Sequence, residues 1–198
     1  MCTTKNMSPT QQRTVAAIRQ AFLALLKERP FENITVKMIC TAAQVSKFTF
    51  YNYYCDKYAL AEAISEDFID GLCNAIESSE FSESGNIERS KKVYRFVTEK
   101  KDVYHSLSTL TLNGVNFSQR LLEKLQQLTQ RQIRDGMKRS GFTASDEAII
   151  FFSHMTASGE LAEIEIIVNG LIPWERLTLF QQVTAINNGI LLQKICKL

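Results

Sequence analysis

Proline, histidine and long apolar runs are scarce in this 198-residue sequence. It has three prolines, and with 45% apolar and 22% charged residues it matches neither a disordered nor a collagen-like chain. No apolar run approaches the roughly 20 residues needed to cross a bilayer, and the first 30 residues carry no secretory signal. These absences predict a globular protein of the cytoplasm with no membrane partner.

Paired cysteines and catalytic motifs are also absent. The five cysteines form no CxxC pair, which argues against a zinc cluster or a disulfide framework. The two histidines are too few for most metal or catalytic sites, and no GxSxG, P-loop or GxGxxG motif occurs. We interpret Glu160, Glu163 and Glu165 as a solvated helix face rather than a metal site. We therefore expect no metal, no cofactor and no enzyme, with a small helical enzyme as a minor alternative.

The net charge is small, at +2, but the charges are unevenly distributed. Residues 1–60 contain eight basic and three acidic side chains, whereas the remaining 138 residues contain 15 basic and 18 acidic ones. A basic first part joined to a mildly acidic remainder favours an anionic partner for the first part. Surface lysines are common, so this excess needs the support of a residue pattern.

Apolar residues recur at three- and four-residue spacing along nearly the whole chain, which predicts an all-α fold. A first helix is expected over about 9–29, because Pro30 cannot continue it. Thr35 and Ser46 are good N-caps for two short helices joined near Gln44. Longer helices and no strand are expected after these, over about 57–77, 86–98, 101–110, 116–139, 144–168 and 173–194.

Two short helices with a three- to four-residue connection are typical of a helix-turn-helix, whose second helix enters the major groove of DNA. The stretch from Val45 to Lys57 carries hydroxyls, three tyrosines and two lysines, with no acid before Asp56. Hydroxyl and amine groups donate hydrogen bonds to phosphate oxygens. This second helix is therefore expected to lie along double-stranded DNA.

The same stretch resembles the DNA-binding part of TetR/AcrR-type transcriptional regulators, whose pattern reads T-V-x-x-I-x-x-x-A-G-V-S-x-x-T-F-Y-x-Y-F-x-x-K-x-x-L. The matching residues are Thr35, Val36, Ile39, Ala43, Val45, Ser46, Thr49, Phe50, Tyr51, Tyr53, Lys57 and Leu60. The resemblance implies about nine helices, with a three-helix DNA-binding domain in residues 1–57 and a helical ligand-binding and dimerisation domain in residues 58–198. It also implies a homodimer that binds a palindromic operator, most simply as a repressor, controlled by a small molecule or a partner protein.

The expected DNA contacts come from the helix-turn-helix, and several have an ordinary structural alternative. Thr35 is a cap whose hydroxyl also suits a phosphate, Lys47 is a contact or a solvated lysine, and the resemblance makes Lys57 a phosphate contact. Asn52 and Tyr53 are expected to point outward toward base edges, whereas Phe50 and Tyr54 are expected in the core. The full set of expected contacts is Thr35, Ser46, Lys47, Phe48, Thr49, Tyr51, Asn52, Tyr53 and Lys57.

The sequence departs from the family pattern at two positions. Gln44 replaces the usual turn glycine, so either the turn differs or Gln44 is strained by about 1 kcal/mol. Phe48 replaces a small residue, and its ring either packs on a thymine methyl or obstructs docking. These departures motivate an alternative function, a co-regulator that acts through a protein partner with weak or no DNA binding.

The remaining helices carry two expected surfaces. The last two helices hold more apolar residues than one face hides, which indicates a dimer interface or, alternatively, a larger internal core. Aromatic residues of the middle helices are the expected lining of a ligand pocket. The expected interface residues are Leu161, Ile164, Val168, Val183, Ile186 and Ile190. The expected pocket residues are Tyr94, Tyr104, His105, Phe117, Phe151 and Met155.

Two short segments, at 27–31 and 173–178, resemble a small subgroup of the family. The best-known members of this subgroup regulate dihydroxyacetone kinase operons through a protein partner. The resemblance therefore implies that the controlling partner of this chain is either a small molecule or a protein.

Overall fold

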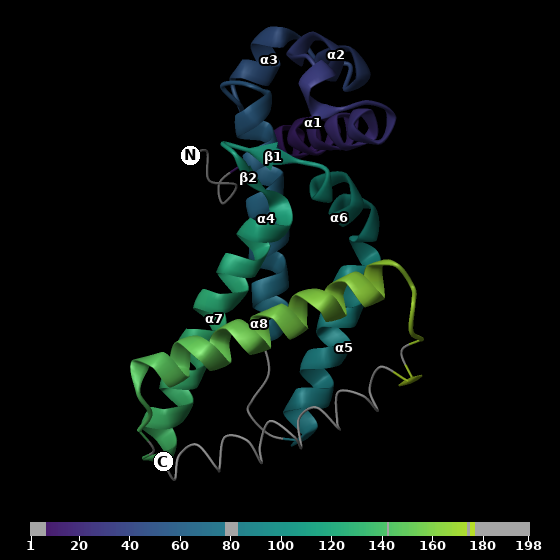
Figure 1. Ribbon diagram of the computed structural model, residues 1–198. Coiled ribbons are helices and arrows are strands. Elements are labelled where there is room, and N and C mark those ends of the chain that lie inside the picture. Colours follow the sequence, from purple (N-terminus) through teal and green to yellow (C-terminus); the bar gives the residue numbers. More distant parts are fainter. Residues whose placement is uncertain (1–6, 78–82, 142, 174, 177–198) are drawn as a thin grey trace. The chain divides into compact units, whose positions relative to one another are not determined.

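A computed structural model describes residues 7–77, 83–141, 143–173 and 175–176 (Figure 1). The described chain contains eight α-helices, one short 3₁₀ helix and one two-stranded hairpin. The predicted all-α fold is confirmed, although the hairpin was not expected. Most of the last expected helix, over 173–194, lies outside the described residues.

The chain divides into two compact units. One unit comprises residues 1–68 with 102–117, and the other comprises residues 69–101 with 118–198. Within the described residues, no helix is long and apolar enough to cross a membrane.

Helix α1, Pro9–Glu28, begins at a reciprocal N-terminal cap. The Ser8 hydroxyl accepts a hydrogen bond from the backbone N–H of Gln11, and the Gln11 side chain accepts one from the backbone N–H of Ser8. The helix ends before Pro30, as expected from the missing N–H of proline. Its apolar stripe, which includes Ile18 and Phe22, is completely buried at these two positions.

Three short helices follow: the 3₁₀ helix η2 (Phe31–Asn33), α2 (Val36–Ala42) and α3 (Lys47–Tyr51). Helix α2 packs against α1. The core of this region consists of apolar side chains with no exposed surface, so it fixes the orientation of the short helices. These side chains are Ile18, Phe22, Ile34, Ile39, Phe50 and Leu60.

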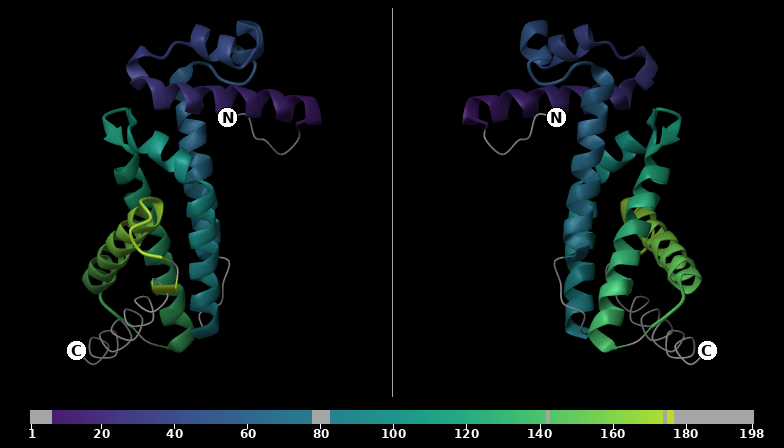
Figure 2. Two further views of the ribbon diagram at one scale, coloured as in Figure 1. Left: turned by 90° about the vertical axis from the view of Figure 1, so that its right-hand side faces the viewer. Right: turned by 90° about the vertical axis from the view of Figure 1, so that its left-hand side faces the viewer.

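Helix α4, Lys57–Glu77, contains the boundary between the two units, which falls after Phe68. Figure 2 shows α1 crossing the beginning of α4. In the same unit, α6 (Lys101–Ser108) brings Tyr104 against the rings of Phe68 and Phe117, with centroids 5.9 and 5.8 Å from that of Tyr104. This aromatic cluster joins residues from three elements into one core.

A short hairpin connects α6 to the next helix. Strands β1 (Thr111–Leu112) and β2 (Val115–Asn116) pair in antiparallel register. The turn residues Asn113 and Gly114 have φ values of 54° and 80°, the two positive angles that a type I′ turn requires. An Asn-Gly pair is the usual sequence signal for such a turn. The flanking strands have only two residues each, which is too short for an alternating apolar pattern to predict them.

The second unit is built from α5 (Glu83–Glu99), α7 (Phe117–Ser140) and α8 (Asp146–Val168), with the end of α4. Helix α5 packs against α8. Helix α4 approaches α5 closely at Gly71, where an added Cβ would lie 2.7 Å from the Phe96 ring. The absence of a side chain at Gly71 therefore allows this close packing.

Candidate nucleic-acid interface

The two short helices of the expected helix-turn-helix begin at the predicted caps. Thr35 accepts a hydrogen bond from the backbone N–H of Met38 at 3.3 Å, and Ser46 accepts one from that of Thr49 at 3.0 Å. Because each cap satisfies an N–H group that lacks a partner inside the helix, both short helices have defined starts. Helix α3 ends at Tyr51.

The turn between α2 and α3 forms without a glycine. Gln44 has a φ of 55°, in the left-handed region, so the turn has the expected geometry and Gln44 carries the strain. The backbone N–H of Val45 donates to the carbonyl of Cys40 at 3.0 Å and closes the turn. A residue other than glycine therefore adopts the left-handed conformation at this turn, at a cost of about 1 kcal/mol.

Helix α3 turns a polar and aromatic face outward. Lys47, Phe48, Tyr51 and Asn52 are exposed, with 77% of Phe48 and 54% of Tyr51 accessible to solvent. Thr49 and Tyr53 are half-buried, so the expectation that Tyr53 points fully outward is only partly met. The expected core positions of the helix, Phe50 and Tyr54, are both buried.

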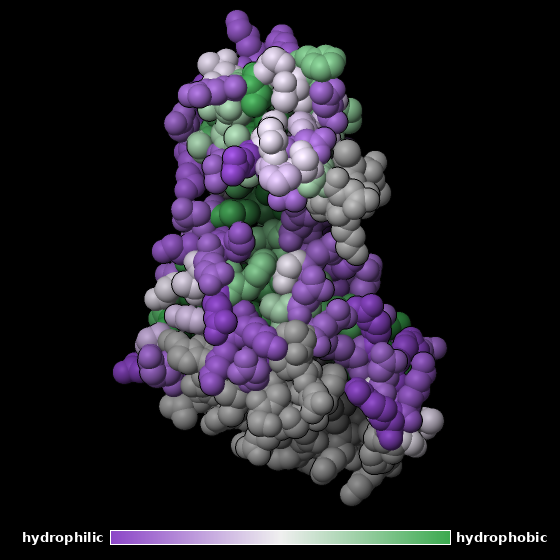
Figure 3. All heavy atoms as spheres, turned by 180° about the vertical axis from the view of Figure 1, so that it is seen from behind, coloured by the Kyte–Doolittle hydropathy of each residue, from purple (hydrophilic) through white to green (hydrophobic). Residues whose placement is uncertain are grey.

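Phe48 has the largest exposed fraction, 77%, among the exposed large apolar side chains of the described residues. On the face shown in Figure 3, hydrophilic residues cover most of the described surface and apolar residues form smaller patches. Neither neighbour of Phe48, Lys47 or Thr49, is acidic. The ring is therefore presented to solvent among groups that suit an anionic partner.

Lys57 has a set of internal partners that its sequence position did not suggest. Its Nζ atom donates to the carbonyls of Phe31, Glu32 and Ile34 at 2.8, 3.0 and 2.9 Å. It also lies 4.5 Å from the Phe31 ring centroid and 5.5 Å from that of Tyr58. An ammonium group has three N–H donors, and three internal acceptors take them. We therefore interpret Lys57 as a residue that positions the start of α4 beneath the helix-turn-helix.

A second contact network, which the sequence did not predict, is centred on Arg19. Its Nε donates to the hydroxyl of Tyr54 at 2.9 Å, and its guanidinium forms an ion pair with Asp67. These residues come from α1, the segment after α3, and α4. Their separations of 35 and 48 residues leave no local sequence signal, so only the tertiary structure reveals them.

The six expected pocket residues are divided between the two units. Tyr104 and Phe117 are buried in the aromatic cluster of the first unit, where His105 is exposed. In the second unit, Tyr94 is half-buried. Phe151 and Met155 are exposed on α8, by 58% and 61%.

The described part of the expected dimer interface is mostly internal. Ile164 and Val168 are buried and Leu161 is half-buried. These positions therefore agree with the alternative of a larger internal core. The expected interface residues Val183, Ile186 and Ile190 lie outside the described residues.

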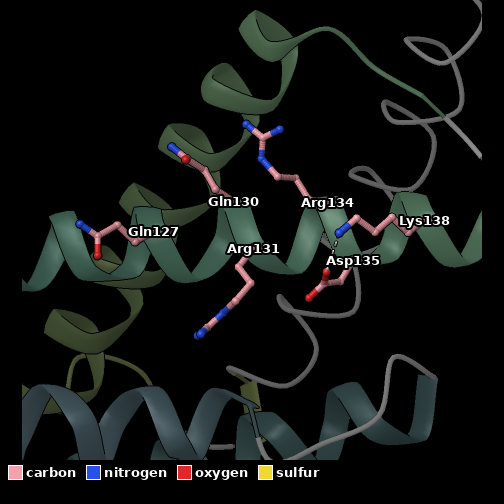
Figure 4. A pocket seen from close by; sticks show the side chains of 6 residues that line it. All are labelled: Gln127, Gln130, Arg131, Arg134, Asp135 and Lys138. Atoms are coloured by element: carbon pink, nitrogen blue, oxygen red, sulfur yellow. Dashed lines mark ion pairs between the residues drawn. The ribbon is translucent and has the colours of Figure 1, made fainter.

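A hollow of about 420 Å³ lies on α7, lined by Gln127, Gln130, Arg131, Arg134, Asp135 and Lys138 (Figure 4). Each of its cations is close to an acid. Arg131 pairs with Glu77, Arg134 lies 3.0 Å from Asp146, and Lys138 lies 3.9 Å from Asp135. Because these acids offset the basic groups, the hollow is poorly suited to an anionic ligand.

The three glutamates of α8 differ from the solvated face that was expected. Glu165 is exposed and Glu163 is half-buried, but the Oε2 atom of Glu160 is buried. Both sides of α8 are rich in apolar residues, so the sequence does not show that Glu160 lies between the buried positions Ala157 and Ile164. Among the described residues, no group of acids, histidines and cysteines has the arrangement of a metal site.

Comparisons with known proteins identify the helix-turn-helix region. Residues 18–64 match the model of the family described as "Bacterial regulatory proteins, tetR family". A curated relative, the "Uncharacterized HTH-type transcriptional regulator YxbF" of Bacillus subtilis (strain 168), is 39% identical over 77 residues. This match covers 39% of the chain but only 20% of the relative, so the chain matches about a fifth of that protein's length.

Solved structures share the fold over most of the chain. The "Dihydroxyacetone kinase operon activator DhaS" superposes with a TM-score of 0.59 and 23% identity, covering 92% of this chain and 96% of that one. A TetR transcriptional regulator from Streptococcus agalactiae 2603V gives 0.55 and 20% identity, covering 88% and 94%. The matched family consists of regulatory proteins rather than enzymes. Residues 18–64 of the chain are therefore similar to the tetR family of bacterial regulatory proteins, and the described helices share the fold of the solved structures.

Proposed function

We propose that this chain binds a palindromic DNA operator as a homodimer in the cytoplasm and that an effector at its second unit controls the binding. The observation that carries this proposal is the outward face of α3. Lys47, Tyr51 and Asn52 are exposed on or directly after a capped recognition helix, and no acid occurs between Ser46 and Cys55. Such a face complements phosphates and base edges at the same time.

The proposed contacts divide into two groups. Lys47, Thr49 and Tyr51 suit phosphate oxygens, as do the hydroxyls of the two caps at Thr35 and Ser46. Phe48, Asn52 and the exposed part of Tyr53 suit base edges in the major groove. The DNA-binding domain then corresponds to residues 1–57, and residues 58–198 form the ligand-binding and dimerisation domain.

A homodimer is supported by the exposed face of α8. Phe151 and Met155 are large, apolar and largely exposed, and Ala162 lies exposed further along the helix. Two copies joined along such a face would be related by a twofold axis and would place two recognition helices on one palindrome. This face is a better candidate for the dimer surface than the buried Ile164 and Val168.

Selection of bound sequences from a random DNA pool, followed by gel-shift titration, tests the proposal. We expect recovery of an inverted repeat whose half-sites are one helical turn or a multiple of it apart. The dependence of affinity on salt should be steep, because phosphate contacts release counterions. Failure of the full chain to bind any DNA at low salt would contradict the proposal.

The second candidate function is a co-regulator with little DNA affinity, and the exposed ring of Phe48 is the observation that favours it. A phenyl ring that obstructs docking would weaken binding to every sequence, whereas a ring that reads a base would not. Regulation can have either sign, since the related DhaS is named an operon activator. A reporter gene placed behind the selected site distinguishes repression from activation.

A further inference from the structure

Glu160 lies on the inward face of α8. Ala157, three residues before it, and Ile164, four residues after it, lie on the same side of the helix and are buried. Its Oε2 atom is buried as well and has no hydrogen-bond partner among the described residues. Buried side-chain oxygens are nearly always hydrogen-bonded in native proteins, so this atom is an exception that requires an explanation.

The groups around Glu160 do not neutralise it. Burial raises the pKa of its carboxyl to about 7, while the charge of Arg89 on α5 acts to lower that pKa and Glu163 acts to raise it. The net effect is a rise, so the favourable field of Arg89 does not compensate for the loss of water.

The charge of Glu160 also affects the pKa of the Cys73 thiol on α4. Burial raises its pKa to about 11, with Lys124 acting to lower it and Asp70, Glu77 and Glu160 acting to raise it. Three carboxylates and one ammonium therefore act on this position. Asp70 and Glu77 are exposed, and Glu77 pairs with Arg131, so Glu160 is the acid of this set that has a buried oxygen. Its carboxylate favours a cation and disfavours an anion.

Most of the other buried side chains of these helices are apolar, and the buried Ser153 of α8 donates to the carbonyl of Ile150. Leu72 and Ile76 flank Cys73 on α4, and Val93 and Val97 are buried on α5, which packs against α8. An aliphatic residue at position 160 would fit this interior without loss of solvation. An ionised carboxyl in such surroundings is unfavourable, so it either takes up a proton or accepts a hydrogen bond from a bound donor.

We propose that the Glu160 carboxylate is the anchor of an effector site in the second unit, and that the ligand is an organic cation with an ammonium or amidinium group on an apolar body. The unpartnered Oε2 accepts a hydrogen bond from the cationic group, and the aliphatic side chains of α4 and α5 take up the apolar body. A metal ion is disfavoured, because the described residues around Glu160 supply no three-ligand set. The inference rests on the proposed function, since it supplies the effector of that regulator.

Thermal unfolding in the presence of two small probes tests this site. Benzylamine carries the ammonium and the apolar ring, and benzyl alcohol has nearly the same shape without the charge. We expect benzylamine to raise the midpoint of unfolding of the full chain in a saturable way, since a ligand bound only by the folded state stabilises it. Benzyl alcohol should raise the midpoint much less.

Three variants test whether the rise in the unfolding midpoint with benzylamine depends on Glu160. Glu160→Gln should abolish the shift with benzylamine, and so should Glu160→Leu, which we expect to fold at least as stably as the wild type. Glu165→Gln removes an exposed carboxylate from the same helix and should leave the shift unchanged. Equal shifts with both probes, a shift that survives in Glu160→Gln, or no shift at tens of millimolar benzylamine would each overturn the proposal.

DNA binding separates this inference from the function on which it rests. Benzylamine should change the gel-shift affinity of the wild type for the selected operator, and Glu160→Gln should bind the same operator without responding to the amine. Operator binding by the wild type with no response in either measurement rejects the effector site alone. Absence of operator binding rejects the proposed function, while the thermal shift still reports on the cation site.

Discussion

Single side chains on the first unit differ in whether they face solvent or the protein. Lys47 and Lys57 both lie in the stretch that resembles the family pattern. Lys47 is exposed, whereas Lys57 donates hydrogen bonds to three backbone carbonyls. A charge that contacts phosphate contributes to the salt dependence of binding, whereas a charge that holds the backbone does not. The two lysines therefore have distinguishable effects on DNA affinity.

Lys47→Ala should weaken binding to all sequences and lower the slope of log affinity against log salt by about one. Lys57→Met should also weaken binding, but with a slope close to that of the wild type. It should in addition lower the free energy of unfolding by about 1–3 kcal/mol, because part-buried carbonyls lose their donor. Gel-shift titrations at several salt concentrations and urea unfolding provide the measurements.

Lys91→Ala removes an exposed lysine from α5 and serves as the control for charge alone. Its affinity and salt slope should match those of the wild type. A full unit of slope lost in Lys57→Met, with unchanged stability, would show that Lys57 contacts phosphate after all.

The exposed ring of Phe48 allows a test at the level of one methyl group. Replacing thymine by uracil in the operator removes only the C5-methyl, and we expect the wild type to lose several-fold in affinity at one position of each half-site, equivalent to roughly 1 kcal/mol. Phe48→Ala should bind both DNAs equally. Wild-type affinity that is the same for thymine and uracil at every position would exclude this contact.

At the scale of helices, the sequence predicted most elements because their signals are local. The caps at Ser8, Thr35 and Ser46 and the break at Pro30 fix helix ends within a few residues. The contacts of Arg19 and Lys57 were unpredictable, since their partners are 23 to 48 residues away. The inward turn of Glu160 was missed for a related reason: a helix with apolar residues on both sides does not reveal which side is buried.

Close helix packing at Gly71 gives a prediction for one pair of elements. Gly71→Ala should lower the free energy of unfolding by about 1–3 kcal/mol, because its Cβ would overlap the Phe96 ring and force α4 and α5 to shift. Gly136→Ala on α7 is the matched control, since nothing lies within 4 Å of its Cβ position. The control should raise stability by up to about 1 kcal/mol through helix propensity. Equal effects of the two substitutions in urea unfolding would argue against the tight contact.

For the whole molecule, the number of copies in solution decides whether α3 can read a palindrome. Light scattering should give twice the mass of one chain, and Met155→Glu should shift the mass toward that of a single chain by placing a charge in the apolar face of α8. Lys91→Glu also introduces an acid at an exposed position and should remain dimeric. A wild-type monomer, or a Met155→Glu dimer of unchanged stability, would reject this face as the interface.

The buried carboxyl of Glu160 also makes the stability of the whole molecule depend on pH. With a pKa near 7 against an ordinary value of 4.5, the folded chain holds a proton that the unfolded chain has already released at intermediate pH. The free energy of unfolding contributed by this group therefore falls as pH rises from about 4.5 to 7. A cation that binds beside Glu160 must displace that proton, so acidification competes with the cation. Binding of the proposed cation should therefore weaken as pH falls below about 7.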